Sequence, residues 1–275
     1  MRPLLRALAC LVPFAIATPA VAGPLDELTL DVEAGPLYFL QNDGRYGAAG
    51  TFYTAETVAQ NRNLFVAKRL SGEARFLDRH TVVLLYAPLD VATTVTLGAP
   101  LTFRDVTFPT GSVVTHRYLF DGLRASYLYR LYQGYGLTGE LGATLQIRNA
   151  QVAFTDEAGT RFVAERDIGF VPALKARLRY DTPNGLYAMW EADGLASPVF
   201  SGVKGSILDT ALTLGLPVRS DADVFVRLRY LGGGAEVPNR EINNWGQFLV
   251  ASGGIRWKLG NPPTPLAPAV PPTAD

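Results

Sequence analysis

The nine residues Ala222-Asp-Val-Phe-Val-Arg-Leu-Arg-Tyr230 alternate between apolar and charged side chains with a period close to two. In an extended chain, Val224, Val226, Leu228 and Tyr230 point to one side, while Asp223, Arg227 and Arg229 point to the other. This is the period of a β-strand with one apolar face and one polar face. The stretch therefore predicts a strand, within residues 222–233, that separates a charged environment from an apolar one.

Two other segments show the same alternation. Segment 160–181 places Leu174, Ala176, Leu178 and Tyr180 opposite Lys175, Arg177 and Arg179. Segment 135–154 places Leu137, Leu141, Ala143, Leu145 and Ile147 opposite Thr138, Glu140, Thr144, Gln146 and Arg148. In segment 112–132, Asp121 and Arg124 fall out of phase, which predicts a β-bulge at Gly122.

The whole pattern predicts ten strands, over residues 28–40, 61–76, 80–96, 112–132, 135–154, 160–181, 185–197, 205–217, 222–233 and 245–259. Compact turns at 77–79, 133–134, 182–184 and 219–221 alternate with connections at 41–60, 97–111, 155–159, 198–204 and 234–244, most of which are longer. Short periplasmic turns and long outer loops are typical of bacterial barrels, which have an even number of strands.

Residues 23–275 contain no run of eighteen apolar residues that would form a membrane-spanning helix. Because hydrocarbon cannot hydrogen-bond to the backbone, a chain without such helices spans a bilayer only as a closed barrel. The sequence therefore predicts an all-β fold, a transmembrane antiparallel up-and-down β-barrel of about ten strands. Aromatic residues on the apolar faces are expected near the periplasmic ends (Tyr127, Tyr129, Tyr180 and Trp257) and near the outer rim (Tyr230 and Trp245). A soluble β-sandwich remains the alternative.

The N-terminus has the features of a secretory signal. Arg2 and Arg6 precede an apolar run over 7–17, and Ala20-Val21-Ala22 predicts cleavage before Gly23. We therefore expect a signal peptide at 1–22, an outer-membrane β-barrel at 23–260 and a Pro-rich disordered tail at 261–275. A lipoprotein site at Cys10 is the alternative, although it would leave almost no apolar segment.

Cleavage would remove Cys10, which is the only cysteine, and would therefore exclude disulfides and cysteine-ligated metals from the mature chain. Removing Arg2 and Arg6 from the 25 basic residues leaves 23 against 25 acidic residues, a formal charge of −2. This balance does not indicate a nucleic-acid partner. We expect outer-membrane lipid and, during biogenesis, the barrel-insertion machinery as partners, with small solutes or envelope components as further candidates.

The polar faces carry complementary charges on neighbouring strands. Lys175, Arg177 and Arg179 would lie beside Glu191 and Asp193, and Asp209 beside Arg227 and Arg229. On closure of the barrel, Asp31 and Glu33 would meet Arg256 and Lys258. The predicted charge network of the lumen comprises Asp31, Glu33, Glu140, Arg148, Lys175, Arg177, Arg179, Glu191, Asp193, Asp209, Arg227, Arg229, Arg256 and Lys258. Ten strands enclose a lumen that such side chains can largely fill.

Catalytic patterns are weak in this chain. The two histidines, His80 and His116, are expected at opposite ends of the barrel, and His116 has no recognisable catalytic spacing to Ser112 or Ser126. A group of Asp105, Asp156 and Glu157 near His116 would resemble the acidic sites of barrel proteases, but no motif supports it. A surface position without a special role is the simpler interpretation of His116. We expect neither a metal site nor a cofactor.

Several segments resemble a group of uncharacterised Gram-negative outer-membrane β-barrel proteins: Leu85-Tyr86-Ala87-Pro88-Leu89, Tyr118–Tyr132, Gln146–Ala150, Asp167–Pro172 and Leu231–Glu236. The resemblance covers most of the mature chain. It implies the fold and an outer-membrane location, and it transfers no catalytic residue. One departure is that the last strand ends near Leu259 and a proline-rich tail follows, whereas barrels commonly finish on a terminal aromatic residue.

The leading hypothesis is a non-enzymatic membrane or interaction protein with a largely filled lumen. A narrow, anion-preferring channel for small solutes is the alternative, since Lys175, Arg177, Arg179, Arg227 and Arg229 would form a basic ladder. A third hypothesis is a lipid- or peptide-cleaving barrel enzyme that uses His116. A fourth is a soluble periplasmic β-protein.

Overall fold

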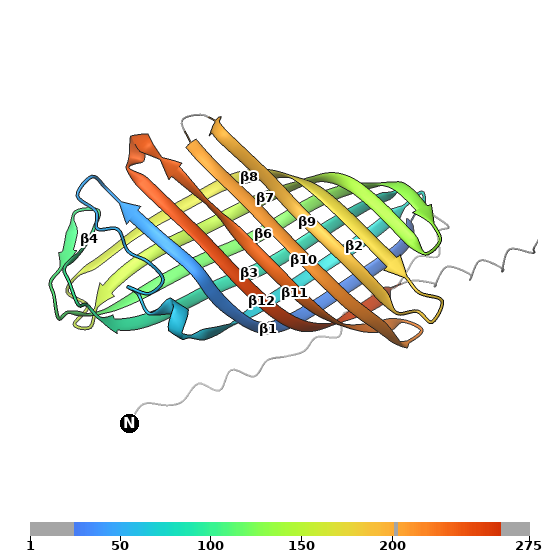
Figure 1. The fold of residues 1–275 in the computed structure, drawn as a ribbon, viewed down its shortest axis with the longest axis horizontal. Helices are drawn as coiled ribbons and strands as arrows, with labels where there is room; N and C mark the ends of the chain where they lie inside the picture. Colours follow the sequence, from blue (N-terminus) through green and yellow to red (C-terminus); the bar gives the residue numbers. More distant parts are fainter. Residues whose placement is uncertain (1–24, 201–202, 260–275) are drawn as a thin grey trace, which may run out of the picture.

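The computed structural model describes residues 25–200 and 203–259, and ten long strands in this part of the chain close into one antiparallel barrel (Figure 1). The strands are β1 (Leu25–Tyr46), β2 (Leu64–Phe76), β3 (His80–Thr96), β6 (Val113–Gly134), β7 (Leu137–Asp156), β8 (Phe162–Asp181), β9 (Tyr187–Phe200), β10 (Val203–Arg219), β11 (Ala222–Val237) and β12 (Ile242–Leu259). Each strand pairs with its neighbour in sequence, and β1 closes the barrel against β12. The predicted fold class is confirmed. The predicted signal peptide (1–22) and tail (261–275) lie outside the described residues.

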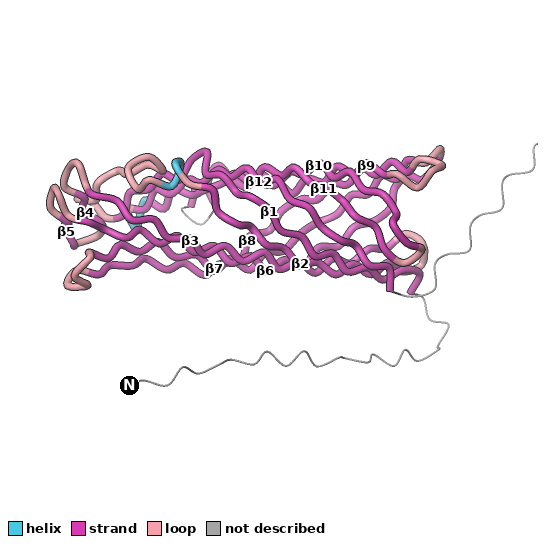
Figure 2. The backbone as a smooth tube through the Cα atoms, turned by 90° about the horizontal axis from the view of Figure 1, so that it is seen from below, coloured by secondary structure: helices cyan, strands magenta, loops and turns pink. Residues whose placement is uncertain are grey.

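The two ends of the barrel differ in their connections (Figure 2). Turns of a few residues join the strands at one end, which we call the turn end. At the other end, the loop end, longer connections contain the short helices η1 (Gln60–Arg62) and η2 (Pro238–Arg240) and a hairpin of β4 (Leu101–Phe103) and β5 (Val106–Phe108). This hairpin lies within residues 97–111, for which the sequence predicted a loop without strands. Within the described ranges, no helix is both long and apolar enough to cross a membrane.

The bulge predicted at Gly122 is wrong. Pairing between β3 and β6 runs without interruption from His80↔Tyr129 to Thr96↔Val113, and the irregularity in β6 lies further on, between Arg130 and Tyr132. Gly122 and Arg124 are buried in the lumen, so the alternation places Asp121 on the outer surface. Asp121 is an isolated outward polar residue between Leu119 and Leu123, so its polarity does not reflect a change of phase.

The outer surface of the barrel is a band of exposed apolar side chains. On β7 and β8 it includes Leu141, Leu145, Ile147, Ile168, Phe170, Leu174 and Leu178. Tyr127 and Tyr180 are exposed toward the turn end, as predicted. Near the loop end of β3 and β6, the band stops at the outward pair Asp90 and Arg117. An exposed apolar surface of this extent needs an apolar surrounding.

The wall contains two places where neighbouring strands pair over only part of their length. β2 and β3 pair from Phe76↔His80 to Leu70↔Tyr86, and β8 and β9 pair from Asp181↔Tyr187 to Leu174↔Gly194. Both splits lie in the loop-end half. The first is filled from inside by the chain around Val58, whose carbonyl oxygen accepts a hydrogen bond of 2.6 Å from Thr93 Oγ1.

Candidate functional site

In the turn-end half of the lumen, one pair of charged side chains joins β1 to β12, the two strands that close the barrel. Asp31 on β1 is paired in register with Arg256 on β12. Arg256 Nε and Nη2 donate to the two carboxylate oxygens of Asp31 at 2.7 and 2.8 Å. A two-point contact of this kind fixes the geometry of both groups. The last strand is therefore joined to the first by side chains as well as by the backbone.

A second set of contacts joins β8 to β9. Lys175 is paired with Asp193 and Arg177 with Glu191. Lys175 Nζ donates to Asp193 at 2.8 Å, and Arg177 Nε donates to Glu191 at 3.2 Å. On the next pair of strands, Arg229 of β11 makes two contacts of 2.6 Å with Asp209 of β10.

Other contacts cross the lumen between strands that are not neighbours. Arg177 on β8 reaches Glu73 on β2 at 2.9 Å, and Arg124 on β6 donates to Asp209 on β10. Arg227 on β11 donates to Glu33 on β1 at 2.5 Å. The first two contacts tie opposite walls together, and the third joins the strands on either side of β12, so charged side chains fill the lumen in this half.

Some predicted partners differ in the structure. Arg227 contacts Glu33 and Thr213 instead of Asp209, and Lys258 donates to Asp223. Arg179 bonds to Asp181 on its own strand, and its guanidinium lies 3.9 Å from the ring centre of Tyr187. Arg148 binds Asp167 further toward the loop end. Glu140 accepts from Arg177 at 3.2 Å and from Thr81 at 3.0 Å.

Several members of this charge network were absent from the predicted set, among them Arg124, Glu73 and Asp223. Arg124 and Glu73 bind partners across the barrel, and Asp223 binds Lys258. The alternation of Asp223 with Val224 already indicated its inward direction. Arg124 was obscured by the assumed bulge, and Glu73 lies in a strand whose alternation is weak.

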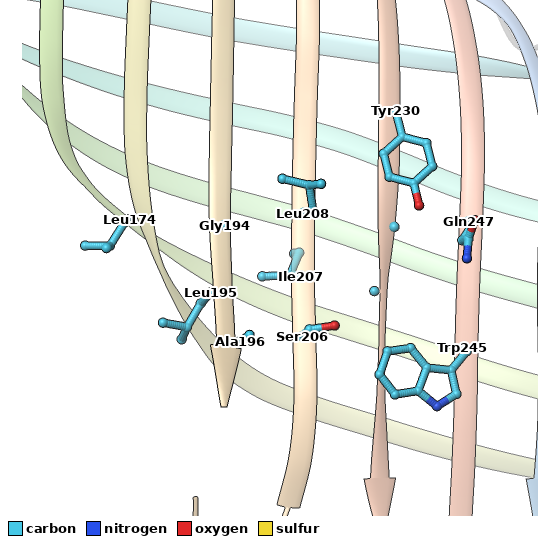
Figure 3. Close-up of a pocket in the computed structure, with 12 residues that line it drawn as sticks. Leu174, Gly194, Leu195, Ala196, Ser206, Ile207, Leu208, Tyr230, Trp245 and Gln247 are labelled. Carbon is cyan, nitrogen blue, oxygen red and sulfur yellow. The ribbon is translucent and has the colours of Figure 1, made fainter. Parts of the chain in front are cut away.

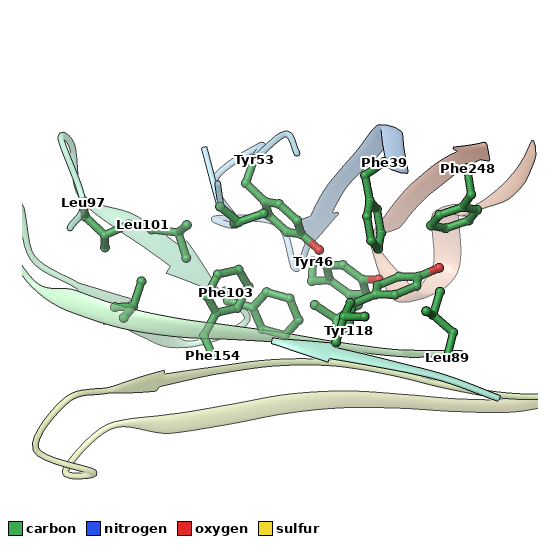
Figure 4. Packing of buried hydrophobic residues seen from close by; sticks show 14 of the residues in the cluster. Phe39, Tyr46, Tyr53, Leu89, Leu97, Leu101, Phe103, Tyr118, Phe154 and Phe248 are labelled. Carbon is green, nitrogen blue, oxygen red and sulfur yellow. The ribbon is translucent and has the colours of Figure 1, made fainter. Parts of the chain in front are cut away.

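The loop-end half of the lumen is apolar and aromatic instead. A cluster that we call the cap contains Phe39, Tyr46, Tyr53, Phe103 and Phe154, and Figure 4 shows these rings gathered from the loops and from opposite walls. Tyr46 stacks on Phe103 with ring centres 4.5 Å apart, and Phe39 meets Phe248 edge-on at 4.9 Å. Aromatic pairs in such arrangements add to the stabilisation from burial. The loop of residues 47–63 thus folds into the mouth.

His116 lies within the cap and not on the surface, because the loop that carries Tyr53 covers it. Its ring centre is 4.8 Å from that of Phe154 and 5.6 Å from that of Tyr53. The side chain is fully buried, and neither ring nitrogen has a hydrogen-bond partner in the described part of the chain. His116 lies on the loop-end side of Asp90 and Arg117, where the apolar outer band stops, and burial lowers its pKa from 6.5 to about 3. His116 is therefore neutral near pH 7.

The geometry does not bring a catalytic group together around His116. Asp156 accepts hydrogen bonds from Thr160 and Arg161 in the β7–β8 turn, and Ser126 is hydrogen-bonded to Thr144 in the lumen. His80, at the turn end, shares a hydrogen bond of 2.7 Å with the hydroxyl group of Tyr127. Among the residues that the structure describes, no group of three or more His, Cys, Asp or Glu side chains could hold a metal ion.

Comparisons with known proteins support the fold. No protein-family model matches the chain, and no curated protein sequence matches it. The outer membrane protease OmpT from Escherichia coli matches with a TM-score of 0.53 and 10% identity, over 85% of this chain and 97% of that chain. Ail, the attachment invasion locus protein of Yersinia pestis, matches with a TM-score of 0.36 and 10% identity, over 84% of this chain and 99% of that chain.

Neisserial surface protein A matches with a TM-score of 0.32 and 14% identity, over 84% of this chain and 97% of that chain. The scores of Ail and of the Neisserial protein are too low to carry an argument. The likeness to OmpT shows that this chain has the fold of a Gram-negative outer-membrane β-barrel. In this chain, buried salt bridges fill the turn-end half of the lumen. At 10% identity the likeness shows nothing about activity.

Proposed function

We propose that the protein is an integral outer-membrane barrel with a non-enzymatic role, closed to the passage of solutes. Its loop end would face the exterior and present the surface that meets other molecules. The observation that carries the proposal is the set of contacts across the lumen, Arg124 to Asp209, Arg177 to Glu73 and Arg227 to Glu33. The cap forms a second barrier in series with them.

The membrane location is supported by the apolar outer band, which a soluble protein would have to cover. Its height fits a bilayer. The outward residues of β8 from Ile168 to Tyr180 are all uncharged, and each is aliphatic or aromatic. The segment 168–180 has thirteen residues, which is more than the 9–11 that a tilted strand needs to span a bilayer. Insertion by the cellular barrel-insertion machinery stays a prediction from the sequence.

A narrow anion channel is the competing proposal, and it depends on free positive charge in the lumen. Lys175, Arg177 and Arg229 each have a carboxylate partner within 3.2 Å. Paired cations offer an anion little unbalanced charge. The structure thus gives the basic ladder a structural role that does not require conduction.

Planar-bilayer conductance of the purified mature protein tests the proposal. Only material whose gel mobility changes on heating, as expected of a folded barrel, is used. We expect no reproducible single-channel steps. Steps from the folded protein, with an ion preference that changes in Arg177→Gln or Arg227→Gln, would overturn the closed barrel in favour of the channel.

A matched control separates lumen effects from changes in folding. The variant Arg117→Gln loses a charge on the outer surface, where Arg117 binds Asp90. Its conductance should equal that of the native protein whichever proposal is correct. Separation of membranes with and without detergent tests the location, because a soluble periplasmic protein would be released without detergent.

A further inference from the structure

The split between β8 and β9 opens the wall of the barrel on its apolar side. Pairing stops at Leu174↔Gly194, although β8 continues beside β7 as far as Phe162 and β9 continues beside β10 as far as Phe200. Beyond this point, the facing edges of the two strands have no strand partner among the described residues. At the split between β2 and β3, the chain around Val58 binds Thr93, whereas no loop segment within the described ranges is hydrogen-bonded across the split between β8 and β9.

The split lies within the apolar outer band. On its β8 side, Ile168, Phe170 and Leu174 are 73%, 72% and 70% exposed. On its β9 side, Leu195 lies two residues after Asp193, which is buried and faces the lumen. Alternate residues of a strand share a face, so Leu195 also points inward, yet its side chain is 38% exposed. The opening therefore uncovers a side chain that belongs to the lumen face.

A groove of about 560 Å³ begins at the split and runs across β9, β10 and β11. Figure 3 shows Leu174 and Leu195 on one side of it and Tyr230 and Trp245 on the other, with Leu208 between them. Its floor is made of small residues, including Gly194, Ser206 and Gly232. The groove is open toward the outside of the barrel and is not an enclosed cavity.

The groove combines two kinds of surface. Leu174, Leu195 and Leu208 form an apolar lining, whereas the unpaired edges of β8 and β9 offer backbone N–H and C=O groups. A purely hydrocarbon ligand would leave these backbone groups unsatisfied, which is costly at membrane depth. A molecule with an apolar chain and polar linkage groups would satisfy both surfaces.

We propose that the groove holds one acyl chain of a lipid from the surrounding leaflet, with the polar linkage of the lipid at the β8–β9 split. The lipid reaches the groove directly, because the groove opens on the apolar outer band. The ends of the lumen offer an apolar molecule no comparable path, since the charge network fills one half and the cap fills the mouth. Tyr230 and Trp245 are residues of the kind that lie at the boundary between hydrocarbon and headgroups.

Photochemical labelling tests this proposal. The protein is placed in phosphatidylcholine vesicles that contain a small fraction of a phosphatidylcholine with a diazirine at the end of one acyl chain, and labelled residues are identified by mass spectrometry. Label is expected on the inward residues Leu195 and Ile207 as well as on outward leucines. Label confined to outward residues such as Leu212 and Val226 would overturn the proposal, because bulk lipid reaches those alone.

A variant that fills the groove is compared with a matched variant on the outer surface away from it. A Cβ atom at Gly194 would lie 3.7 Å from its nearest neighbours, the Ile207 carbonyl oxygen and Leu208 Cδ1, so position 194 accepts a side chain without moving the backbone, and Gly194→Phe places its ring in the groove. Gly253, on the outer face of β12, has a similar clearance of 3.8 Å. Gly194→Phe should lose the label on Leu195 and Ile207, whereas Gly253→Phe should keep it.

If Gly194→Phe does not fold, Ala196→Phe fills the same groove from the next outward position of β9. Unchanged inward label in a folded variant of either kind would contradict the proposal. The result is independent of conductance, because labelling reports on the wall of the barrel whether or not the lumen conducts.

Discussion

The two halves of the lumen are built from different side chains, although the apolar outer band extends over part of both. On β1, the inward residues change from Asp31 and Glu33 in the turn-end half to Leu37 and Phe39 in the loop-end half. On β11, the change comes between Arg229 and Leu231. The turn-end half is held by directional contacts between charges, and the loop-end half is held by close packing of rings. The same closed wall therefore depends on two kinds of interaction whose loss has different costs.

The largest effect is expected from Asp209→Ala in the charged half. Asp209 accepts hydrogen bonds from both Arg124 and Arg229, so its removal leaves two buried guanidinium groups without their partner. Breaking a buried ion pair from one side costs about 4 kcal/mol. Urea unfolding in lipid vesicles, followed by tryptophan fluorescence, measures the loss of free energy of unfolding.

The double variant Asp209→Ala/Arg229→Met checks the cause, because it removes one of the two stranded charges. We expect it to recover part of the lost stability. Equal stability of the single and double variants would contradict the view that uncompensated charge, and not lost packing, dominates this half.

Much of this charged half could be predicted from the sequence, because charged inward residues alternate with apolar outward residues along each strand. The alternation in 222–230 correctly indicated the directions of Arg227 and Arg229, and strand order alone brought Lys175 to Asp193. The contacts across the lumen were not readable. Whether Arg227 reaches Thr213 and Glu33 or Asp209 depends on the tilt of the strands and the width of the barrel, which the order of residues does not contain.

The next effect is expected from Phe39→Ala in the cap. Phe39 is fully buried between Phe65, Tyr118 and Phe248, whose ring centres lie 4.9–5.9 Å away. Truncating a buried phenylalanine leaves a cavity and costs about 3 kcal/mol. The same unfolding experiment measures it.

Phe170→Ala is the matched control, since Phe170 is exposed on the outer band, where lipid can fill the space that is left. Its cost should be clearly smaller than that of Phe39→Ala. Similar costs at both positions would show that the cap is loosely packed and would remove its role as a second barrier.

The cap could not be predicted from the sequence, because both faces of its strands are apolar. Along β1, the inward residues Leu37 and Phe39 alternate with the outward residues Tyr38 and Leu40, so hydrophobicity no longer distinguishes the two directions. The β4–β5 hairpin left a faint signal, since Leu101, Phe103, Val106 and Phe108 surround a turn at Arg104, which has a positive φ of 56°. Strands of three residues are too short for periodicity to identify.

The pH dependence of the cap gives a smaller effect that belongs to this half alone. Because burial lowers the pKa of His116 from 6.5 to about 3, the folded protein excludes a proton that the unfolded chain binds. The contribution of neutral His116 to the free energy of unfolding is complete above pH 6.5 and decreases as the pH falls from 6.5 toward 3. Between neutral pH and about pH 4.5 the loss is about 2.5 kcal/mol.

Replacing His116 by leucine removes this proton linkage. The difference in free energy of unfolding between His116→Leu and the native protein should therefore change by that amount between neutral pH and about pH 4.5. A difference that stays constant with pH would mean that the folded cap admits water or a proton to His116.

The smallest effect is expected from Asp90→Ala on the outer surface, and it sets the scale for the others. Asp90 binds Arg117 through two contacts, one of 2.7 Å, just as Asp209 binds Arg229, but both side chains are almost half exposed. Exposed ion pairs contribute about 0.5 kcal/mol, because water solvates the partner that remains. The contrary result is that Asp90→Ala destabilises the protein as much as Asp209→Ala in the same unfolding experiment. In that case the cost would come from losing any ion pair, and burial would not explain the contribution of the lumen charges to the free energy of unfolding.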